Sequence, residues 1–381
     1  SKGDIDKKGQ ISLNFGLKLC KDENTDTVYI VDEASLIGDR KSGKNSFASY
    51  GSDRLLSDLL NFDENGKFLF IGDSSQLPPI DGTFLPSSQR KVSPALTEKY
   101  IQEVFSYPAQ EFALTEIKRQ DEKSGIVKAS MMLRGLHEKN TNVKWPPFLR
   151  VRGHQDIILH QNHINLVGAY IERIKKDGFY ENIMICQSNQ VRHSINLYVR
   201  KEFFPESKVL AEGDLLSITQ NHSLTGLANG DLVEVLEIFN RVKRAGLIYL
   251  KVRIQEIVSK DIYITYLIED ILLSPKINIS EHQHKKLLMD FHFRMGEKGI
   301  KQKSKVFNES MRNDQFLNGM RAVYGYAISC HKSQGGEWNH VYLYLDNKIL
   351  GIPQPEIYQW WYTAVTRAKV NLHLVDDWFI K

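Results

Sequence analysis

Two apolar runs near the start of the chain end in side chains that could bind a phosphate and Mg²⁺. The run VYIV leads to Asp32 and Glu33, and the run KFLFIG leads to Asp73 and Gln76. Parallel α/β sheets bind ligands where their strands end. One carboxylate can hold Mg²⁺ through water, a second can polarise an attacking water, and an amide can sense a phosphate. The pattern predicts a nucleotide-hydrolysing site with Asp32 at the metal, Glu33 as the base and Gln76 at the phosphate. The alternative is a solvated strand end with two chance acids.

Two arginines further along the chain could contact the same phosphate. Arg119 ends the segment LTEIKR, and Arg367 lies in the segment YTAVTRAK near the C-terminus. Arginines that reach a phosphate from another domain stabilise the charge that spreads during phosphoryl transfer. A single arginine on a helix is normally a surface residue, so both assignments depend on the motifs around them.

The segment SCHKSQGGEW offers a different chemistry. Lys332 and Ser333 can donate hydrogen bonds to phosphates, and the Gly335-Gly336 pair lets a backbone approach closely. His331 could stack on a base or bond to it, because it has no partner at the spacing of a metal site. The segment therefore favours contact with a phosphate-containing ligand.

The elements that must position these side chains alternate between strands and helices. Apolar runs of strand type cover residues 27–35, 67–79 and 181–189, and helical periodicity covers residues 53–62, 94–105, 125–136 and 164–178. Such continuous runs predict strands buried on both faces, and the alternation predicts parallel α/β domains. After residue 208, short β-type runs are followed by a polar, basic stretch at 281–312. We therefore expect two α/β domains, the second with a β module inserted near residues 237–320.

Composition limits the class of protein. The 381 residues carry a formal net charge of +4, with 41% apolar and 25% charged side chains, which is ordinary for a globular chain. Residues 1–120 have a net charge of −3 and residues 121–381 one of +7, so the basic excess lies where a polyanion could bind. A solvated surface without a partner is the alternative. The three widely spaced cysteines suit the cytoplasm, and no apolar run approaches the ~18 residues of a membrane helix.

Five segments occur in order along the chain, namely VDEAS, GDSSQLPP, KRQ, CHKSQGGEW and YTAVTRAK. In these segments the sequence resembles the superfamily 1 DNA helicases, specifically the RecD/Dda-like branch (type B), over nearly its whole length. The resemblance implies an α/β fold of two RecA-like parallel-sheet motor domains, at 1–150 and at 151–236 with 321–381. It also implies an SH3-like β module at 237–320, ATP and Mg²⁺ as cofactors, single-stranded DNA as partner, and 5′→3′ movement.

The resemblance assigns roles to individual residues. The expected catalytic residues are Asp32, Glu33, Gln76, Arg119 and Arg367. Nucleotide contacts are implied for these five together with Gly335 and Glu337, and Asp32 is expected to hold Mg²⁺ through water. Contacts to single-stranded DNA are implied for Asn189, His331, Lys332 and Ser333. Other repair or replication proteins are further candidate partners, and no membrane partner is expected.

One feature of the family is missing from the 381 residues. These helicases bind phosphates with a GxxxxGK[ST] loop before the DEAS strand, and no such loop occurs here. Gly38, Gly43 and Lys44 imitate the spacing, but Asn45 replaces the Ser/Thr and the segment follows the wrong strand. We therefore expect a fragment of a longer motor, or a partial motor, with a truncated first domain and apolar surface left uncovered on its first sheet. We expect little ATPase activity from this chain by itself.

Two other functions stay open at the level of the sequence. The missing loop favours a non-catalytic nucleic-acid-binding module with a degenerate motor fold, whereas the intact set of acids and arginines argues against it. An RNA-directed motor of the same superfamily is a third interpretation that the motifs leave open.

Overall fold

The computed structural model describes residues 2–5, 11–17, 19–20, 27–41, 48–63, 65–80, 82–87, 91–114, 124–138, 149–207, 209–302 and 304–381. The chain divides into two compact units, and each is described by itself. Unit 1 comprises Ser1–Asp121, Ser130–Val143 and Pro353–Thr363, and unit 2 comprises Glu122–Ala129, Lys144–Ile352 and Ala364–Lys381.

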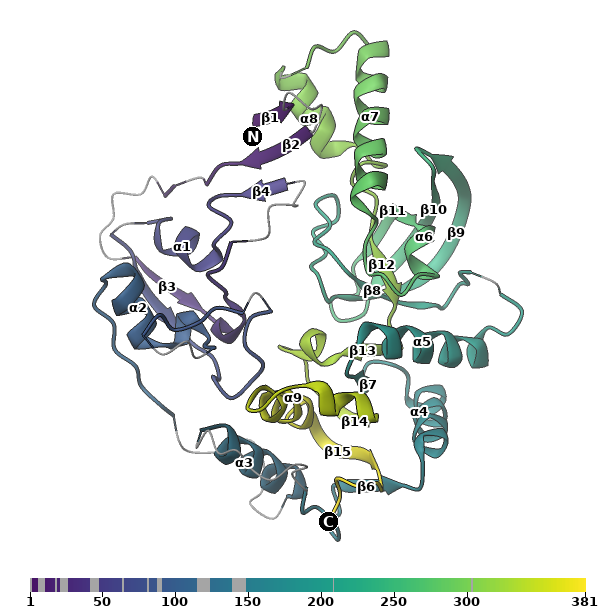
Figure 1. Cartoon of the computed structure of the whole chain (residues 1–381). Helices are drawn as coiled ribbons and strands as arrows, with labels where there is room; N and C mark the ends of the chain where they lie inside the picture. Colours follow the sequence, from purple (N-terminus) through teal and green to yellow (C-terminus); the bar gives the residue numbers. More distant parts are fainter. Residues whose placement is uncertain are drawn as a thin grey trace. The chain divides into compact units, whose positions relative to one another are not determined.

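Unit 1 contains two small sheets (Figure 1). One has the order β1-β2-β4 and consists of β1 (Lys2–Ile5), β2 (Ile11–Phe15) and β4 (Ala48–Tyr50). The other pairs β3 (Val28–Val31) in parallel with β5 (Lys67–Phe70). The helices α1 (Leu55–Leu60) and α2 (Glu98–Phe105) belong to this unit. The helices α3 (Gly125–Glu138) and α9 (Glu356–Val365) each contribute residues to both units.

The β3–β5 pair is buried on one face only. Phe68 and Phe70 pack against the apolar core of unit 1. On the opposite face Val28, Ile30 and Leu69 are 55%, 68% and 50% exposed. The prediction of strands buried on both faces is therefore wrong for β3 and β5, because no part of the described chain covers this second face. The exposed face agrees with the apolar surface that the sequence predicts to be uncovered on the first sheet.

A buried carboxylate organises unit 1 just after β3. Asp39 is 2% exposed. It accepts hydrogen bonds from the backbone N–H of Ser57 at 2.9 Å, the Ser57 hydroxyl at 2.7 Å and the Tyr100 hydroxyl at 3.0 Å. A buried carboxylate needs such donors because its desolvation is costly. The bonds join the segment after β3 to α1 and α2, so they fix the backbone that follows Asp32 and Glu33.

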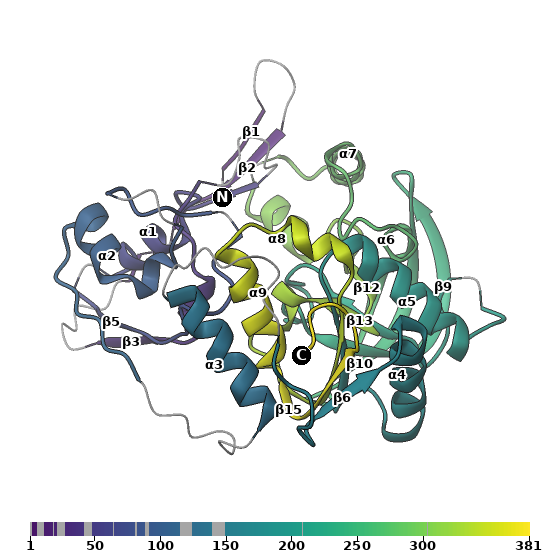
Figure 2. The ribbon, with the colours of Figure 1, turned by 60° about the horizontal axis from the view of Figure 1, so that its bottom comes forward.

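Unit 2 is built on a five-stranded parallel sheet of order β13-β7-β14-β15-β6. Its strands are β6 (Ile157–His160), β7 (Asn182–Cys186), β13 (Ala327–Ser329), β14 (Trp338–Tyr344) and β15 (Ala368–Val375). The helices α4 (His163–Asp177) and α5 (Asn189–Phe203) lie side by side against it (Figures 1 and 2). Every residue of β7 is buried, as its continuous apolar run predicts. Met184 and Cys186 belong to the core that α4 and α5 complete.

A second sheet in unit 2 is antiparallel and has the order β11-β10-β9-β8-β12. Its strands are β8 (Leu215–Ile218), β9 (Leu232–Arg244), β10 (Leu247–Glu256), β11 (Ile262–Ile268) and β12 (Ala322–Tyr324). Register shifts interrupt the long β9–β10 pairing near Val252 and Ile254. Such irregularities bend strands, and Figure 1 shows both strands curved. The sheet runs past both ends of the predicted module at 237–320, because β8 and β12 pair with each other.

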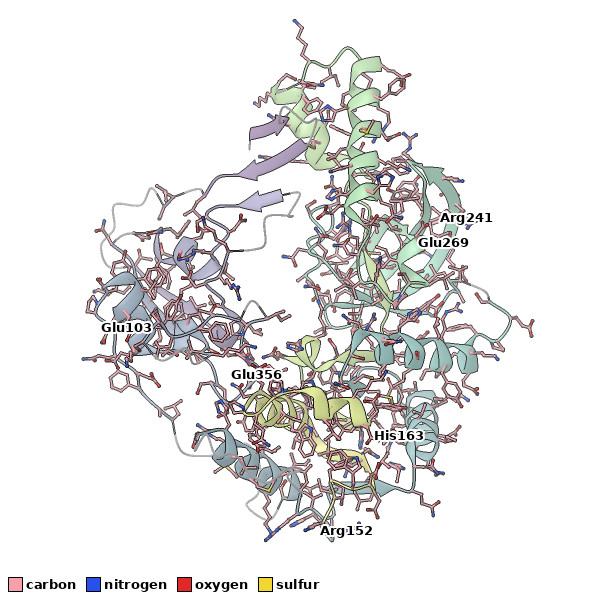
Figure 3. The ribbon with its side chains drawn as sticks, in the orientation of Figure 1. Glu103, Arg152, His163, Arg241, Glu269 and Glu356 are labelled. Carbon is pink, nitrogen blue, oxygen red and sulfur yellow. The ribbon has the colours of Figure 1, made fainter. Side chains whose placement is uncertain are left out.

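Three helices accompany this second sheet. They are α6 (Glu269–Leu272), α7 (Glu281–Glu297) and α8 (Lys305–Asn313). Arg241 of β9 forms an ion pair at 2.6 Å with Glu269 at the start of α6 (Figure 3). The basic stretch at 281–312, for which the sequence predicted no secondary structure, is largely helical, because α7 and α8 cover most of it. Its helix α7 begins at a capping box in which Ser280 and Gln283 bond to each other's backbone.

The predicted α/β class is confirmed, since parallel strands alternate with helices in the β3–β5 pair and in the five-stranded sheet of unit 2. No helix among the described residues is long and apolar enough to cross a membrane. Trp360 and Trp361 are each 1% exposed, so they pack in the interior.

Three histidines form a row across neighbouring strands of the parallel sheet. The rings of His160 on β6 and His340 on β14 lie 5.4 and 6.0 Å from that of His373 on β15. His160 Nε2 and His373 Nδ1 are 3.1 Å apart, and the His373 ring stacks on Tyr342 at 3.9 Å. Burial, together with the nearby charges of His160, His340 and Arg173, lowers the pKa of His373 from 6.5 to about 3.

This burial makes the fold sensitive to acid. A histidine whose pKa is lowered on folding stabilises the protein fully above its unfolded pKa, and this stability is lost as pH falls from 6.5 toward 3. We expect His373 alone to reduce the free energy of unfolding by about 2 to 3 kcal/mol between about pH 7.5 and about pH 4.5. Urea unfolding at the two pH values measures this change.

The variant His373→Leu should lose much of this pH dependence. The matched control is His282→Leu, which changes an exposed histidine and should retain the wild-type dependence. Equal pH dependence in the wild type and His373→Leu would show that the buried row does not cause the acid sensitivity.

Candidate functional site

The first group of predicted site residues lies at the carboxyl end of the β3–β5 pair. Val31 is paired with Phe70, so the segments that follow the two strands leave at the same edge. Asp32 is exposed, and its Oδ1 accepts a hydrogen bond from the backbone N–H of Glu33 at 2.8 Å. Glu33 has a φ of 51°, in the left-handed region. This uncommon conformation turns the chain sharply immediately after the two carboxylates.

The two segments are joined directly by their backbones. Ala34 N–H donates to the Ile71 carbonyl at 2.8 Å, and Ile71 N–H donates to the Val31 carbonyl at 2.8 Å. Gly72 allows this approach, because a Cβ there would lie 2.9 Å from Ser35 N and 3.2 Å from Ala34 N. Asp32 and Glu33 therefore occupy the same edge as the segment that contains Gln76.

The loop that contains Gln76 is ordered by Asp73. One Asp73 oxygen accepts from the Ser75 N–H at 2.9 Å, and the Asp73 carbonyl accepts from the Gln76 N–H at 3.0 Å. The second Asp73 oxygen accepts from the Tyr362 hydroxyl at 2.6 Å. Sequence reasoning missed this contact, since the two residues are 289 positions apart. Asp73 thus positions the loop, and its carboxylate is already engaged by protein donors.

The part of α9 that belongs to unit 1 makes two further bonds to this loop. Gln359 Nε2 donates to the Ser74 carbonyl at 3.0 Å, and the Leu77 N–H donates to Thr363 Oγ1 at 2.9 Å. At the start of α9, Glu356 forms an ion pair at 3.1 Å with Lys91 (Figure 3). The loop is therefore held along its length by one helix face.

Three buried side-chain oxygens on these segments have no hydrogen-bond partner within the described part of the chain. They are Ser35 Oγ, Ser75 Oγ and Gln76 Oε1. Buried polar atoms normally have a partner, so orphaned oxygens next to Asp32 and Glu33 fit a site that a polar ligand completes. No group of three or more His, Cys, Asp or Glu suited to a metal occurs among the described residues. A single carboxylate such as Asp32 fits Mg²⁺, which keeps several waters and takes its other ligands from phosphates.

Arg367 lies in unit 2, next to the turn after β13. It is 4% exposed, and its guanidinium donates to the Gly336 carbonyl at 3.2 Å and to Thr366 Oγ1 at 3.2 Å. The Trp338 N–H donates to the Arg367 carbonyl at 3.0 Å. Gly335 has a φ of +78°, which favours glycine there. Arg367 is therefore positioned together with Gly335 and the half-buried Glu337. Arg119, the other predicted arginine, lies outside the described residues.

The residues predicted to contact single-stranded DNA lie at the carboxyl ends of β7 and β13. Ser329, the last residue of β13, is paired with Cys186, the last residue of β7. The segments that follow carry His331, which is exposed, and Asn189, which is exposed at the start of α5. Ser333 differs from these two. It is fully buried and donates to the Cys330 carbonyl at 2.7 Å, so its hydroxyl supports the turn.

Lys332 lies in the same turn and donates a hydrogen bond from its Nζ to Asn229 Oδ1. Burial, together with the charge of Arg192, lowers the pKa of Lys332 from 10.5 to about 8. Arg192 was not identified from the sequence. A single arginine in the helical segment SNQVRHSIN carries no signal of its own, and only its burial distinguishes it.

In α/β proteins, ligands bind at the carboxyl ends of the parallel strands, which is where these polar side chains lie. Residues 324–375 match the family described as UvrD-like helicase C-terminal domain. The matched segment runs from the end of β12 to the end of β15 and includes His331, Lys332 and Arg367. The resemblance to superfamily 1 helicases is thereby confirmed for this part of the chain.

The chain is also similar to solved Pif1 helicase structures. For Pif1 from Bacteroides in complex with ADP-AlF3 and single-stranded DNA, the identity is 14% and the TM-score 0.43, covering 93% of this chain and 71% of that one. For Pif1 from Candida albicans, the identity is 14% and the TM-score 0.39, covering 92% and 72%. No curated protein matches the chain.

The close backbone approach at Gly72 can be tested by mutation. In Gly72→Ala the added Cβ would contact Ser35 N at 2.9 Å, a backbone atom that cannot move without separating the two segments. We expect the variant to lose about 1 to 3 kcal/mol of unfolding free energy, measured by urea denaturation.

Gly135→Ala is the matched control in unit 1. Gly135 lies inside α3 with nothing within 4 Å of an added Cβ, so this variant should be neutral or up to about 1 kcal/mol more stable. Equal stability of the two variants would contradict the close approach at Gly72.

Proposed function

We propose that this chain carries the main parts of an ATP-dependent motor that moves along single-stranded DNA in the 5′→3′ direction. The observation that supports this most is the convergence of Asp32, Glu33 and Gln76 at one edge of the β3–β5 pair. The direction follows from the resemblance to the type B branch. A cytoplasmic location is part of the proposal, since all three cysteines are free thiols.

Each residue at this edge has a role in the proposal. Asp32 would hold Mg²⁺ through water, Glu33 would accept a proton from the attacking water, and Gln76 would contact the terminal phosphate. Bound MgATP would supply the phosphoryl group whose transfer to water releases the free energy for movement. Arg119 and Arg367 would contact phosphate oxygens, and Gly335 and Glu337 would contact the nucleotide.

The DNA strand would be bound by Asn189, His331 and Lys332, and Ser333 would support the turn after β13. Contacts of this kind are made to the phosphate backbone and to exposed base faces, so they do not depend on sequence. Binding should therefore be sequence-independent and strongly weakened by salt.

A non-catalytic nucleic-acid-binding module is the second candidate. The absence of a GxxxxGK[ST] loop from the 381 residues favours it, because without such a loop the β- and γ-phosphates lose their backbone cradle. Both proposals share the strand contacts in unit 2. They differ in whether Glu33 has a catalytic role.

Single-strand binding tests the shared part of the proposal. Fluorescence anisotropy of the chain with a labelled oligothymidylate of about 16 nucleotides should give an affinity that falls linearly with salt on logarithmic axes. Lys332→Ala should weaken binding and reduce the slope by about 0.7, because one phosphate contact is lost. An unchanged slope would contradict the assignment of Lys332. Tighter binding of an RNA strand of matched sequence than of the DNA strand would favour the RNA-directed motor.

ATP hydrolysis tests the expected inactivity of this chain, and observed turnover would exclude the second candidate. We expect the 381-residue chain alone to have little or no DNA-stimulated, Mg²⁺-dependent turnover, measured by phosphate release. Glu33→Gln is the control, since turnover that survives this change comes from a contaminant. Robust turnover that Glu33→Gln abolishes would contradict the expected inactivity and would exclude the non-catalytic module.

A further inference from the structure

Arg192 is a buried cation that no carboxylate neutralises within the described part of the chain. The residue is 4% exposed, and its Nε and Nη2 have no hydrogen-bond partner in the described part of the chain. No carboxylate among the described residues forms an ion pair with it. Other buried arginines in unit 2 are satisfied, and Arg200 bonds Asp214 at 2.9 Å.

Such a cation is costly for the protein to maintain. A buried charge normally has a partner, because desolvation is repaid only by close opposite charge and hydrogen bonds. Burial lowers the pKa of Arg192, but a guanidinium keeps its proton at neutral pH. The N–H donors on these two nitrogens therefore lack an acceptor within the described part of the chain, and a ligand could supply one.

The position of Arg192 indicates what kind of ligand this is. It lies one turn into α5, a 15-residue helix that begins at Asn189 after the cap residue Ser188. Ser188 satisfies the Val191 N–H at 3.3 Å. The remaining N–H groups of the first turn and the helix dipole favour a negative charge at this end. Two independent features, the helix N-terminus and the buried guanidinium, thus attract an anion to one place.

A second cation lies nearby. Cys186 and Ser329 pair at the ends of β7 and β13, which places the turn with Lys332 beside the start of α5. The Arg192 guanidinium is close enough to Lys332 for its charge to lower the pKa of Lys332. Lys332 gives one hydrogen bond to Asn229, which leaves donors on its ammonium group for another acceptor.

We propose that Arg192 and Lys332 together bind one phosphodiester group of a single strand at the N-terminus of α5. This deepens the proposed function and rests on it, since it adds a buried guanidinium to the surface residues already assigned to the strand.

The variant Arg192→Met tests the proposal, because it removes the charge and keeps an unbranched side chain of similar length. We expect the Kd for oligothymidylate to rise about tenfold and the salt slope to fall by about 0.7. Thermal stability without DNA should stay equal or increase, since an uncompensated buried charge is removed. Arg192→Lys should keep part of the affinity. The matched control is Lys176→Met, an exposed cation at the end of α4 that precedes the amino end of β7.

The outcomes separate this inference from the function on which it rests. A wild-type chain that binds no single strand would overturn the proposed function. Wild-type binding that Arg192→Met leaves unchanged in affinity and slope would overturn the inference alone. Lower thermal stability of Arg192→Met with unchanged binding would assign the guanidinium to the fold instead.

A second measurement identifies the source of the phosphate. Oligothymidylates with one neutral methylphosphonate linkage at successive positions should bind the wild type more weakly at one position, and Arg192→Met should be insensitive there. In parallel, the stabilisation of the wild type and of Arg192→Met by inorganic phosphate and by ADP is measured. If either stabilises the wild type but not Arg192→Met, while the linkage scan shows no sensitive position, the site takes a free phosphate and the proposal is wrong.

Discussion

The parallel pairing of strands is the constraint on which both candidate sites depend. Neighbouring parallel strands end at the same edge of a sheet. Polar residues that follow them are therefore brought together even when they are far apart along the chain. In unit 1 this joins the segments after β3 and β5, and the absence of a side chain at Gly72 lets their backbones touch. In unit 2 it joins the segments after β7 and β13. The acidic residues of the first edge and the basic residues of the second are thus positioned in the same way, by the shared ends of parallel strands.

The electrostatics of the two edges are opposite, as the charge distribution along the sequence suggests. Asp32 and Glu33 remain accessible at the first edge, while Asp73 is occupied by Tyr362 and orders the loop. At the second edge Arg192 and Lys332 are brought close together in partly desolvated surroundings. Like charges held together in this way reduce stability, so an arrangement of this kind is typical of a binding surface for an anion.

Much of the fold follows from local patterns, and the rest depends on contacts that no local pattern encodes. The apolar runs located β3, β5 and β7, and helical periodicity located α4, because each pattern reflects burial within one element. The burial of β3 and β5 was predicted wrongly, since one face of a strand depends on what other elements cover it. The bond of Tyr362 to Asp73 and the burial of Arg192 could not be predicted, because both arise from packing between distant segments.

The central claim is that a single strand lies across the carboxyl ends of β7 and β13. Photo-crosslinking tests this most directly, with an oligothymidylate in which 5-iodouridine replaces successive thymidines, followed by mass spectrometry of the linked peptides. The account predicts crosslinks in the segments 187–192 and 330–334, lost when salt dissociates the complex. Crosslinks confined to α7, α8 or the sheet of β8 to β12 would contradict it.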